Sequence, residues 1–211
     1  MSKEKTINEP LLAIAEHAGN LTSLELYLCD RIMGATVLAF ITIHQPISPI
    51  THLSLPGCHC STDTVVLSVA AYCPNLHYLD LRACRFISDV SIVAVARACP
   101  QLYHLNVGRF LERDRITDAS ILEIARLTQI TVLGLAGCDI TDECILILSE
   151  HRGDAIEAIY VGNCPRITYR SIRALVAKCK KLRVFRLKEC HHVRDWEAVG
   201  ELVQRGVLLG L

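Results

Sequence analysis

The sequence is poor in aromatic residues and carries no net charge. Aromatic residues make up 5% of the 211 residues, although 51% of them are hydrophobic. This balance suits a long aliphatic core built by stacked repeats better than one globule centred on aromatic side chains. The 22 Lys and Arg residues are matched by 22 Asp and Glu residues. Because no overall basic field results, we expect neither nucleic acid nor an anionic membrane as a partner.

Long apolar runs are also absent. No stretch approaches the roughly 18 uninterrupted apolar residues that a transmembrane helix needs. The first ten residues, MSKEKTINEP, are charged and lack the apolar centre of a signal peptide. We therefore expect a soluble intracellular protein, located in the cytoplasm and nucleus.

Apolar residues instead recur at fixed spacings along the chain. Leu76, Leu79 and Leu81 stand three and two residues apart, and Cys84 follows after three more. The same frame begins again at Leu21, Ile50, Leu102, Ile130, Ile156 and Leu182. The second apolar anchor of each copy returns after 29, 26, 26, 28, 26 and 26 residues. This period and pattern define a leucine-rich repeat array.

Each repeat is expected to contain a short strand and a helix. Alternation around the L-x-L pair points the two leucines inward. Hydroxyl and carboxylate side chains that can accept the free amides of a helix's first turn precede four apolar runs: Ser61-Thr62-Asp63, Ser88-Asp89, Thr117-Asp118 and Thr141-Asp142. Because strands pack about 4.8 Å apart and helices about 10 Å apart, the array should curve. The prediction is an α/β right-handed solenoid, or horseshoe, with a parallel sheet on the concave face and helices on the convex face.

The two ends of the array look like partial units. Residues 9–19 fit the helix of a preceding half-repeat, and residues 195–204 indicate a last helix. Val207 and Leu208 then stand near the register of an eighth strand. We predict a single domain over residues 1–211 with about seven repeats. Such ends leave apolar edges, so it stays open whether the chain is the C-terminal part of a longer protein.

Eleven cysteines raise the questions of disulfides, metals and nucleophiles. Six of them occupy the repeat frame: Cys29, Cys58, Cys84, Cys138, Cys164 and Cys190. These should be reduced and buried, with each S–H serving backbone carbonyls of a turn. Cys58-His59-Cys60 and Cys190-His191-His192 suggest zinc, but zinc needs four ligands that converge on one point. We predict no metal and no cofactor.

An enzyme is also not expected. A cysteine nucleophile needs a partnered histidine, whereas His52 and His104 should point to the concave face, away from the buried thiols. The sequence contains neither a glycine-rich phosphate loop nor a pair of carboxylates spaced for acid–base work.

The residues between the anchors should line the concave face. By register, one column contains His52, Tyr78 and His104, a second contains Ser54, Asp80 and Asn106, and a third contains Pro56, Arg82 and Gly108. Tyr and Arg are frequent anchors in protein interfaces. We predict that Tyr78, Asp80, Arg82, His104 and Asn106 form a partner-binding cluster. The alternative is that each is simply a polar residue at an exposed strand position.

The repeat that begins at Leu102 departs from the frame. Phe110 stands where the cysteine should fall, and a charged loop lengthens the repeat by two residues. Insertions in solenoids often lie on the binding face. We expect Phe110 to fill the space of the missing cysteine and leave Arg109, Glu112, Arg113 and Arg115 for a partner.

Two segments carry a resemblance to known families. CRFISD at 84–89 and CPQLYHLNV at 99–107 resemble the cysteine-containing leucine-rich repeats of F-box proteins. Leu81–Arg109, with Ile116–Asp118, is similar to the fungal antagonist-of-mitotic-exit-network family. Members of that family resemble this chain in lacking the repeat cysteine after Gly-Arg and in carrying a charged loop there. The closing Arg194-Asp195 and its helix are similar as well.

The resemblance implies a non-catalytic regulator of the cell cycle that binds a small signalling GTPase and restrains exit from mitosis. It also implies an alternative, a substrate-recognition subunit of a Skp–cullin–F-box ubiquitin ligase. The helix expected at 9–19 is too short to be an F-box, so a ligase role would need another region or another docking mode. An unrelated scaffold or inhibitor is a third possibility. In each case we expect a monomer with a protein partner.

Overall fold

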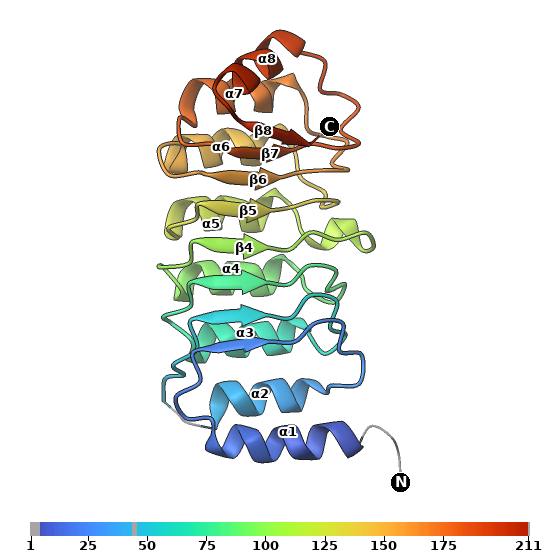
Figure 1. Ribbon diagram of the computed structural model, residues 1–211, viewed down its shortest axis with the longest axis vertical. Coiled ribbons are helices and arrows are strands. Elements are labelled where there is room, and N and C mark those ends of the chain that lie inside the picture. Colours follow the sequence, from blue (N-terminus) through green and yellow to red (C-terminus); the bar gives the residue numbers. More distant parts are fainter. Residues whose placement is uncertain (1–4, 44–45, 211) are drawn as a thin grey trace.

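The computed structural model describes residues 5–43 and 46–210 as alternating helices and short strands (Figure 1). The helices are α1 (Lys5–His17), α2 (Gly34–Thr42), α3 (Asp63–Tyr72), α4 (Asp89–Ala98), α5 (Asp118–Leu127), α6 (Asp142–Arg152), α7 (Tyr169–Lys178) and α8 (Trp196–Gln204). The strands are β1 (Ser23–Glu25), β2 (His52–Ser54), β3 (Tyr78–Asp80), β4 (His104–Asn106), β5 (Val132–Gly134), β6 (Ala158–Tyr160), β7 (Val184–Arg186) and β8 (Leu208–Gly210). A single 3₁₀ turn, η1 (Arg113–Arg115), follows β4.

All eight strands form one parallel sheet in the order of the sequence. The second anchors lie in register, so that Leu53 pairs with Leu79 and Leu79 with Leu105. In Figure 1 the helices from α3 to α7 lie behind the sheet, whereas α1 and α2 lie at the N-terminal end of the stack. The predicted leucine-rich-repeat solenoid is thus confirmed. We call the side of the sheet turned away from the helices its open face.

The ends of the array also agree with the sequence. The helix expected at 9–19 is α1, which starts earlier and ends at His17. The expected last helix is α8, with Asp195 as the residue before its first turn. β8 supplies the eighth strand. None of the helices in the described ranges is long and apolar enough to cross a membrane.

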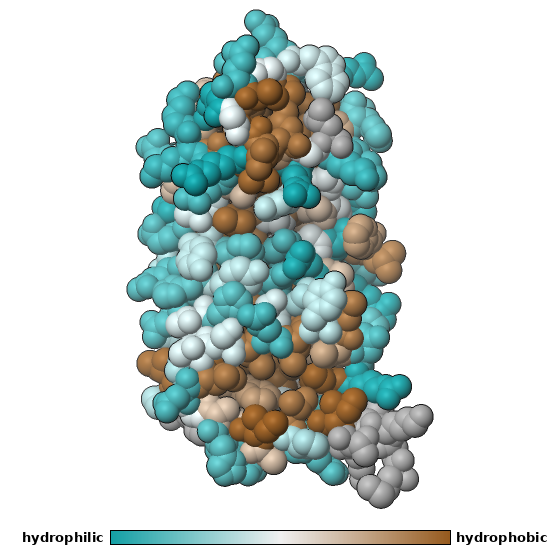
Figure 2. Space-filling view, viewed as in Figure 1, coloured by the Kyte–Doolittle hydropathy of each residue, from teal (hydrophilic) through white to brown (hydrophobic). Residues whose placement is uncertain are grey.

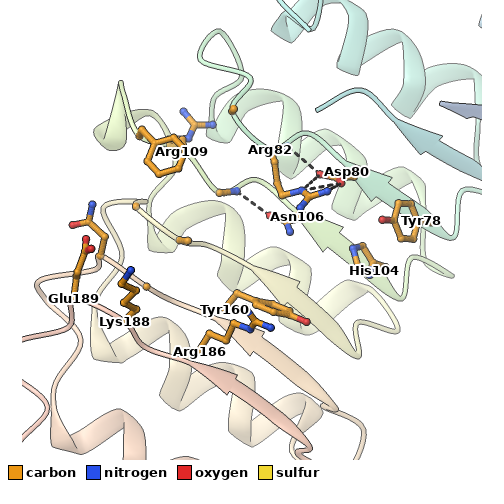
Figure 3. A pocket seen from close by; sticks show the side chains of 17 residues that line it. Tyr78, Asp80, Arg82, His104, Asn106, Arg109, Tyr160, Arg186, Lys188 and Glu189 are labelled. Atoms are coloured by element: carbon orange, nitrogen blue, oxygen red, sulfur yellow. Dashed lines mark hydrogen bonds and ion pairs between the residues drawn. The ribbon is translucent and has the colours of Figure 1, made fainter. Parts of the chain in front are cut away.

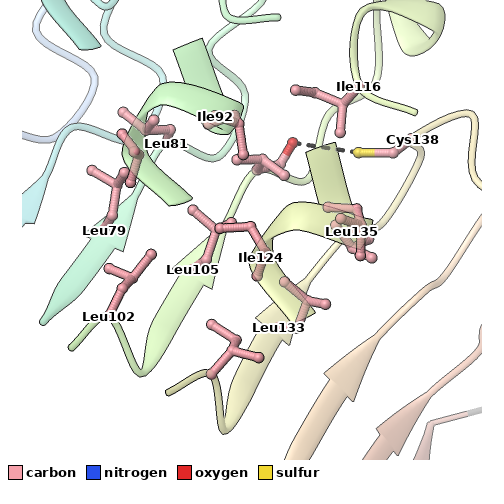
Figure 4. Packing of buried hydrophobic residues seen from close by; sticks show 14 of the residues in the cluster. Leu79, Leu81, Ile92, Leu102, Leu105, Ile116, Ile124, Leu133, Leu135 and Cys138 are labelled. Carbon is pink, nitrogen blue, oxygen red and sulfur yellow. Dashed lines mark hydrogen bonds between the residues drawn. The ribbon is translucent and has the colours of Figure 1, made fainter. Parts of the chain in front are cut away.

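The core runs between sheet and helices without a break. The anchors Leu79, Leu81 and Leu105 are completely buried, and Ile92 of α4 and Ile124 of α5 pack against them from the helices (Figure 4). Each of these side chains contributes about 1.5–3 kcal/mol by leaving water. Because every repeat places the same kinds of side chain at the same depth, one continuous core replaces separate domain cores.

Five of the six cysteines in the repeat frame, which we call the cysteine ladder, have the predicted role. Cys29 does not, because it is half-buried and its Sγ donates to the carbonyl of Tyr27 in its own turn. Cys84 Sγ donates to the carbonyl of Leu55 at 3.1 Å, and Cys164 Sγ donates to the carbonyl of Leu135 at 3.3 Å. Each thiol therefore ties its own turn to the preceding repeat. All eleven cysteines are free thiols, and ten of them are buried. Burial raises the pKa of the Cys84 thiol to about 11, which keeps it protonated as a donor.

The acidic residues at the helix starts act differently from the expectation. The hydroxyls of Ser88, Thr117 and Thr141 cap their own helices as predicted, and Ser88 Oγ for example accepts from the amide of Val90. At the start of α3 the prediction is wrong, because the Thr62 side chain makes no such bond. The carboxylate of Asp63 instead reaches into the next repeat. It accepts from the amide of Ser88 at 2.8 Å, from Ser88 Oγ at 2.7 Å and from Ser91 Oγ at 2.6 Å. Similar bonds to the following repeat are made by Asp89, Asp118 and Asp142.

These four aspartates form what we call the carboxylate ladder. Burial opposes ionisation of Asp63, but the hydrogen bonds from Ser91 and Ser88 outweigh it and lower the pKa of the carboxyl. The ionised carboxylate thereby fixes where the next helix begins. The four carboxylates stand in the first turn of their own helices, as predicted for the helix dipole, but the hydrogen bonds they accept come from the next repeat and not from the amides of that turn.

Candidate protein-binding face

Three aromatic rings stack across neighbouring strands on the open face. The ring centroids of His52 and Tyr78 lie 3.8 Å apart with planes 9° from parallel. Tyr78 and His104 lie 4.0 Å apart at 18°. The register predicted this column, and the spacing of neighbouring strands brings the rings into contact. Burial lowers the pKa of His104 to about 4, so this ring is neutral at pH 7.

Asp80 is on the predicted face but is not free to bind a partner. Its side chain is only 1% exposed, because the guanidinium of Arg82 covers it. Arg82 Nε donates to the two carboxylate oxygens at 3.0 and 2.9 Å, and Arg82 Nη2 donates at 2.7 Å. The prediction of Asp80 as a contact residue is therefore corrected. Arg82 remains 54% exposed and carries the surface of the pair.

Asn106 lies beside this pair and is half-buried. Its Oδ1 accepts from the amide of Gly108 at 3.2 Å. A Cβ atom at Gly134 on the next strand would come within 2.3 Å of the Asn106 side chain. The glycine therefore gives Asn106 the room to lie across the sheet. Tyr78, Arg82, His104 and Asn106 are thus brought together as predicted.

The loop after β4 is built around a buried arginine. Arg109 is 3% exposed, and its guanidinium donates to the carbonyls of Ile87 at 3.2 Å, Glu112 at 3.1 Å and Val107 at 3.4 Å. Two predictions are corrected here. Arg109 serves the turn carbonyls in the repeat that lacks a cysteine and is not available to a partner. Phe110 does not fill that space, because it is 83% exposed.

Two further arginines fasten the same loop to the repeats on either side. Arg113 donates to Asn163 Oδ1 at 3.1 Å and to the Asn163 carbonyl at 2.5 Å. Arg115 donates to Asp63 Oδ2 at 3.4 Å and to the Phe86 carbonyl at 3.2 Å. Both cations thus make internal bonds, while Arg113 and Arg115 stay partly exposed, so that their contact with a partner stays a prediction. Glu112 is exposed, and its φ of 52° lies in the left-handed region.

A hollow of about 710 Å³ joins these parts on the open face (Figure 3). Its lining includes the predicted Tyr78, Asp80, Arg82, His104, Asn106 and Arg109, and also Tyr160, Arg186, Lys188 and Glu189. Arg186 Cζ lies 5.8 Å from the centroid of the Tyr160 ring. Our site prediction omitted Tyr160, Arg186 and Lys188. They occupy the same columns three and four strands further along, so the repeat register was the signal for them.

The hydropathy of the open face changes along the molecule. Figure 2 shows polar side chains over its middle and apolar groups near the two ends. An apolar projection stands at the edge of the middle region, where the loop after β4 emerges (Figures 1 and 2). Among the residues that the structure describes, no group of three or more His, Cys, Asp or Glu side chains is placed to hold a metal ion.

The fold defines a leucine-rich-repeat protein whose sheet carries a hollow on its open face. The yeast Rad7 chain, solved in a complex with Elc1, has a similar fold with a TM-score of 0.52 and 18% sequence identity. The match covers 99% of this chain and 70% of that one. It supports the fold class. No family model matches the sequence.

The sequence is similar to fungal proteins named antagonist of mitotic exit network protein 1. The protein from Candida glabrata is 37% identical over 177 residues, which cover 84% of this chain and 34% of the relative. The protein from Eremothecium gossypii is 34% identical, with 85% and 45% covered, and that from Yarrowia lipolytica is 37% identical, with 86% and 24% covered. The chain is therefore a homologue of these proteins across its repeats, which confirms the resemblance. It spans less than half the length of these relatives.

Proposed function

We propose that this chain is the protein-binding repeat region of a regulator that restrains exit from mitosis by binding a small signalling GTPase. One observation carries the proposal: the similarity to proteins named for antagonism of mitotic exit extends over 84–86% of the chain in these three relatives. That length includes the repeats that build the open face, which is the usual recognition surface of such solenoids.

The proposed role is binding without catalysis, by a monomer that needs no cofactor. Most of the cysteines favour this reading, because burial raises the pKa of thiols such as Cys99 and Cys164 to about 12 and leaves them poor nucleophiles. The exception is Cys60, whose pKa is lowered by its hydrogen bond with Cys58. His104 is held neutral in a ring stack on the open face. We propose the cytoplasm and nucleus as its locations, since a regulator of mitotic exit acts there.

The test measures binding of the purified chain to the mitotic-exit GTPase loaded with GDP or with a non-hydrolysable GTP analogue. We expect saturable binding to one nucleotide state by calorimetry. Tyr78→Ala should weaken it about tenfold, because an aromatic anchor at the centre of an interface contributes about 1–2 kcal/mol. Tyr169→Ala, at the exposed start of α7, is the matched control and should leave binding unchanged.

The ubiquitin-ligase alternative stays a prediction, and co-purification from cells distinguishes it. Recovery of a cullin adaptor with the tagged chain would favour the ligase reading. Recovery of the GTPase in a nucleotide-dependent manner would favour the first reading. If neither protein is recovered, both readings are contradicted and an unrelated scaffold role gains support.

A further inference from the structure

We infer that Phe110 and Leu111 form an apolar anchor for the partner, and that Arg186 and Lys188 receive carboxylates of the same partner across the hollow. The partner surface is then an acidic protein segment that lies beside an apolar pocket. The inference takes the identity of the partner from the proposed function. The chemistry of the contact is argued independently, from the residues of this chain. None of these four residues was among the partner-binding residues predicted from the sequence.

The first support is the exposure of the two apolar side chains. Phe110 is 83% exposed and Leu111 is 63% exposed at the projecting loop beside the hollow. A single exposed apolar residue is ordinary. Two adjacent ones on a projecting loop form a contiguous apolar patch, and such patches mark sites that a partner covers. The fold gains nothing from their exposure, since Arg109 already serves the carbonyls of that turn.

The second support is the rigidity of the loop that presents them. Arg109 holds its base from inside, Arg113 bonds to Asn163 two repeats ahead, and Arg115 bonds to Asp63 two repeats behind. Burying the charge of Arg109 costs free energy, which its hydrogen bonds to the loop carbonyls offset. A loop fixed in this way loses little conformational freedom when a partner binds, which favours affinity. The three arginines therefore shape the contact and Phe110 makes it.

The third support is the distribution of charge. Residues 165–211 contain eleven Lys and Arg residues against four Asp and Glu residues, whereas residues 1–164 contain eleven against eighteen. The net charge of zero thus combines an acidic N-terminal part with a basic C-terminal part. Arg186 and Lys188 line the hollow at its basic end. Among the described residues neither forms an ion pair, while Arg82 at the other end is paired with Asp80.

Together these features favour an acidic protein over a nucleic acid. A basic groove for single-stranded nucleic acid needs aromatic rings free for base stacking. Of the rings that line the hollow, Arg186 lies over that of Tyr160 and two histidines enclose that of Tyr78. Phe110 is left as one exposed ring, which is not a platform on which successive bases could stack. Leu111 adds aliphatic surface, which suits a protein pocket. The two unpaired cations would steer a carboxylate-rich segment toward the apolar anchor.

The experiment uses the whole chain and two probes. One probe is a fluorescein-labelled twelve-residue peptide of alternating Glu and Leu, compared with its Lys–Leu counterpart. The other is the nucleotide-loaded GTPase of the proposed function. The test variants are F110S/L111S and R186E/K188E. The matched controls are V90S/V203S, which removes exposed apolar groups elsewhere, and R170E/K181E, which reverses exposed charges elsewhere.

We expect each test variant to weaken binding of the Glu–Leu peptide and of the GTPase at least tenfold. The controls should stay within twofold, and circular dichroism should show that all variants are folded. Equal binding of the Lys–Leu peptide, or displacement of the Glu–Leu peptide by a single-stranded RNA at equal concentration, would overturn the inference. So would wild-type affinity for both probes in both test variants.

The two proposals fail separately. If the wild-type chain binds the Glu–Leu peptide in the expected pattern but not the GTPase, the proposed function is wrong and the contact chemistry holds. If it binds the GTPase but the test variants bind equally well, the contact is elsewhere and the function holds. If the wild-type chain binds neither probe, both proposals are wrong.

Discussion

At the scale of single residues, Arg109 shows how a repeat tolerates the loss of its cysteine. The ladder cysteines bond the preceding repeat through one S–H, as Cys84 does to Leu55. Arg109 donates from Nε and Nη1 to carbonyls of the loop and of the preceding repeat, while its Nη2 is buried without a partner. A longer loop can thus be accommodated without leaving its carbonyls unpaired. Burial lowers the pKa of Arg109, which remains a cation at pH 7.

Arg109→Ala should lower the free energy of unfolding by about 3 kcal/mol, because it leaves several buried carbonyls without donors. Arg109→Lys should rescue little, since an ammonium cannot reach three carbonyls in fixed directions. The measurement is urea denaturation followed by circular dichroism. Arg126→Ala, at an exposed position of α5, is the control and should change stability by less than about 0.5 kcal/mol. Equal stability of the two alanine variants would contradict the structural role.

His104 gives the protein a pH dependence that can be measured. Burial holds the pKa of its folded form at about 4, whereas a free histidine titrates near 6.5. The unfolded chain therefore takes up a proton before the folded chain does as the pH falls. This contribution to stability is complete above pH 6.5 and is lost progressively toward pH 4.

We expect the wild-type protein to lose more stability between pH 7.5 and 5.0 than His104→Phe, which keeps a ring on Tyr78. Denaturation curves at the two pH values provide the comparison. His151→Gln, on the exposed side of α6, serves as the control and should follow the wild type. A His104→Phe variant with an unchanged pH dependence would mean that His104 is not held neutral by its neighbours.

At the scale of helices and strands, the sequence predicted the pieces better than their connections. The L-x-L anchors and the 3.6-residue periodicity located the middle strands and helices because each signal lies within one repeat. The carboxylate ladder crosses between repeats, so a single helix start could not show it. Its trace in the sequence is Ser-Asp-x-Ser at Ser88 and Thr-Asp-x-Ser at Thr117, where the last serine meets the aspartate of the repeat before.

Asp142 is the clearest place to test this ladder. Its carboxylate accepts from the amide and the hydroxyl of Thr168 at 2.8 and 2.6 Å and from Ser171 Oγ at 2.5 Å. Asp142→Ala should cost about 3 kcal/mol in thermal or urea unfolding, because buried donors lose an ionised acceptor. Asp154→Ala, in an exposed turn, should cost little. The loss of stability in Asp142→Asn should lie between those of the two alanine variants, since an amide keeps only one of the two acceptor oxygens of the carboxylate.

At the scale of the whole molecule, the open face was predictable as a surface but not as a set of free groups. Register placed Tyr78, Arg82 and His104 correctly because strand neighbours are fixed by the period. It could not show that Asp80 lies under Arg82, or that Arg109 turns inward while Phe110 turns outward. Those outcomes depend on which donors find acceptors once the repeats are stacked. The net charge of zero likewise does not show that the basic residues are concentrated in the C-terminal part of the chain.

The carboxylate ladder has a consequence for how the molecule comes apart. Thr168 is followed by Tyr169, so α7 offers no aspartate to the last repeat. The charged links there are the ion pair of Arg173 with Asp195, at 2.6 Å, and the bonds that Arg205 donates to the carbonyls of Val176 and Cys179. Arg173 is 66% exposed, and surface pairs contribute about 0–1 kcal/mol. Local unfolding should therefore start in the C-terminal repeat. In hydrogen–deuterium exchange, we expect the amides of α8 and β8 to lose protection well before those of α4 to α6. Simultaneous exchange of all repeats would show instead that the solenoid opens as one unit.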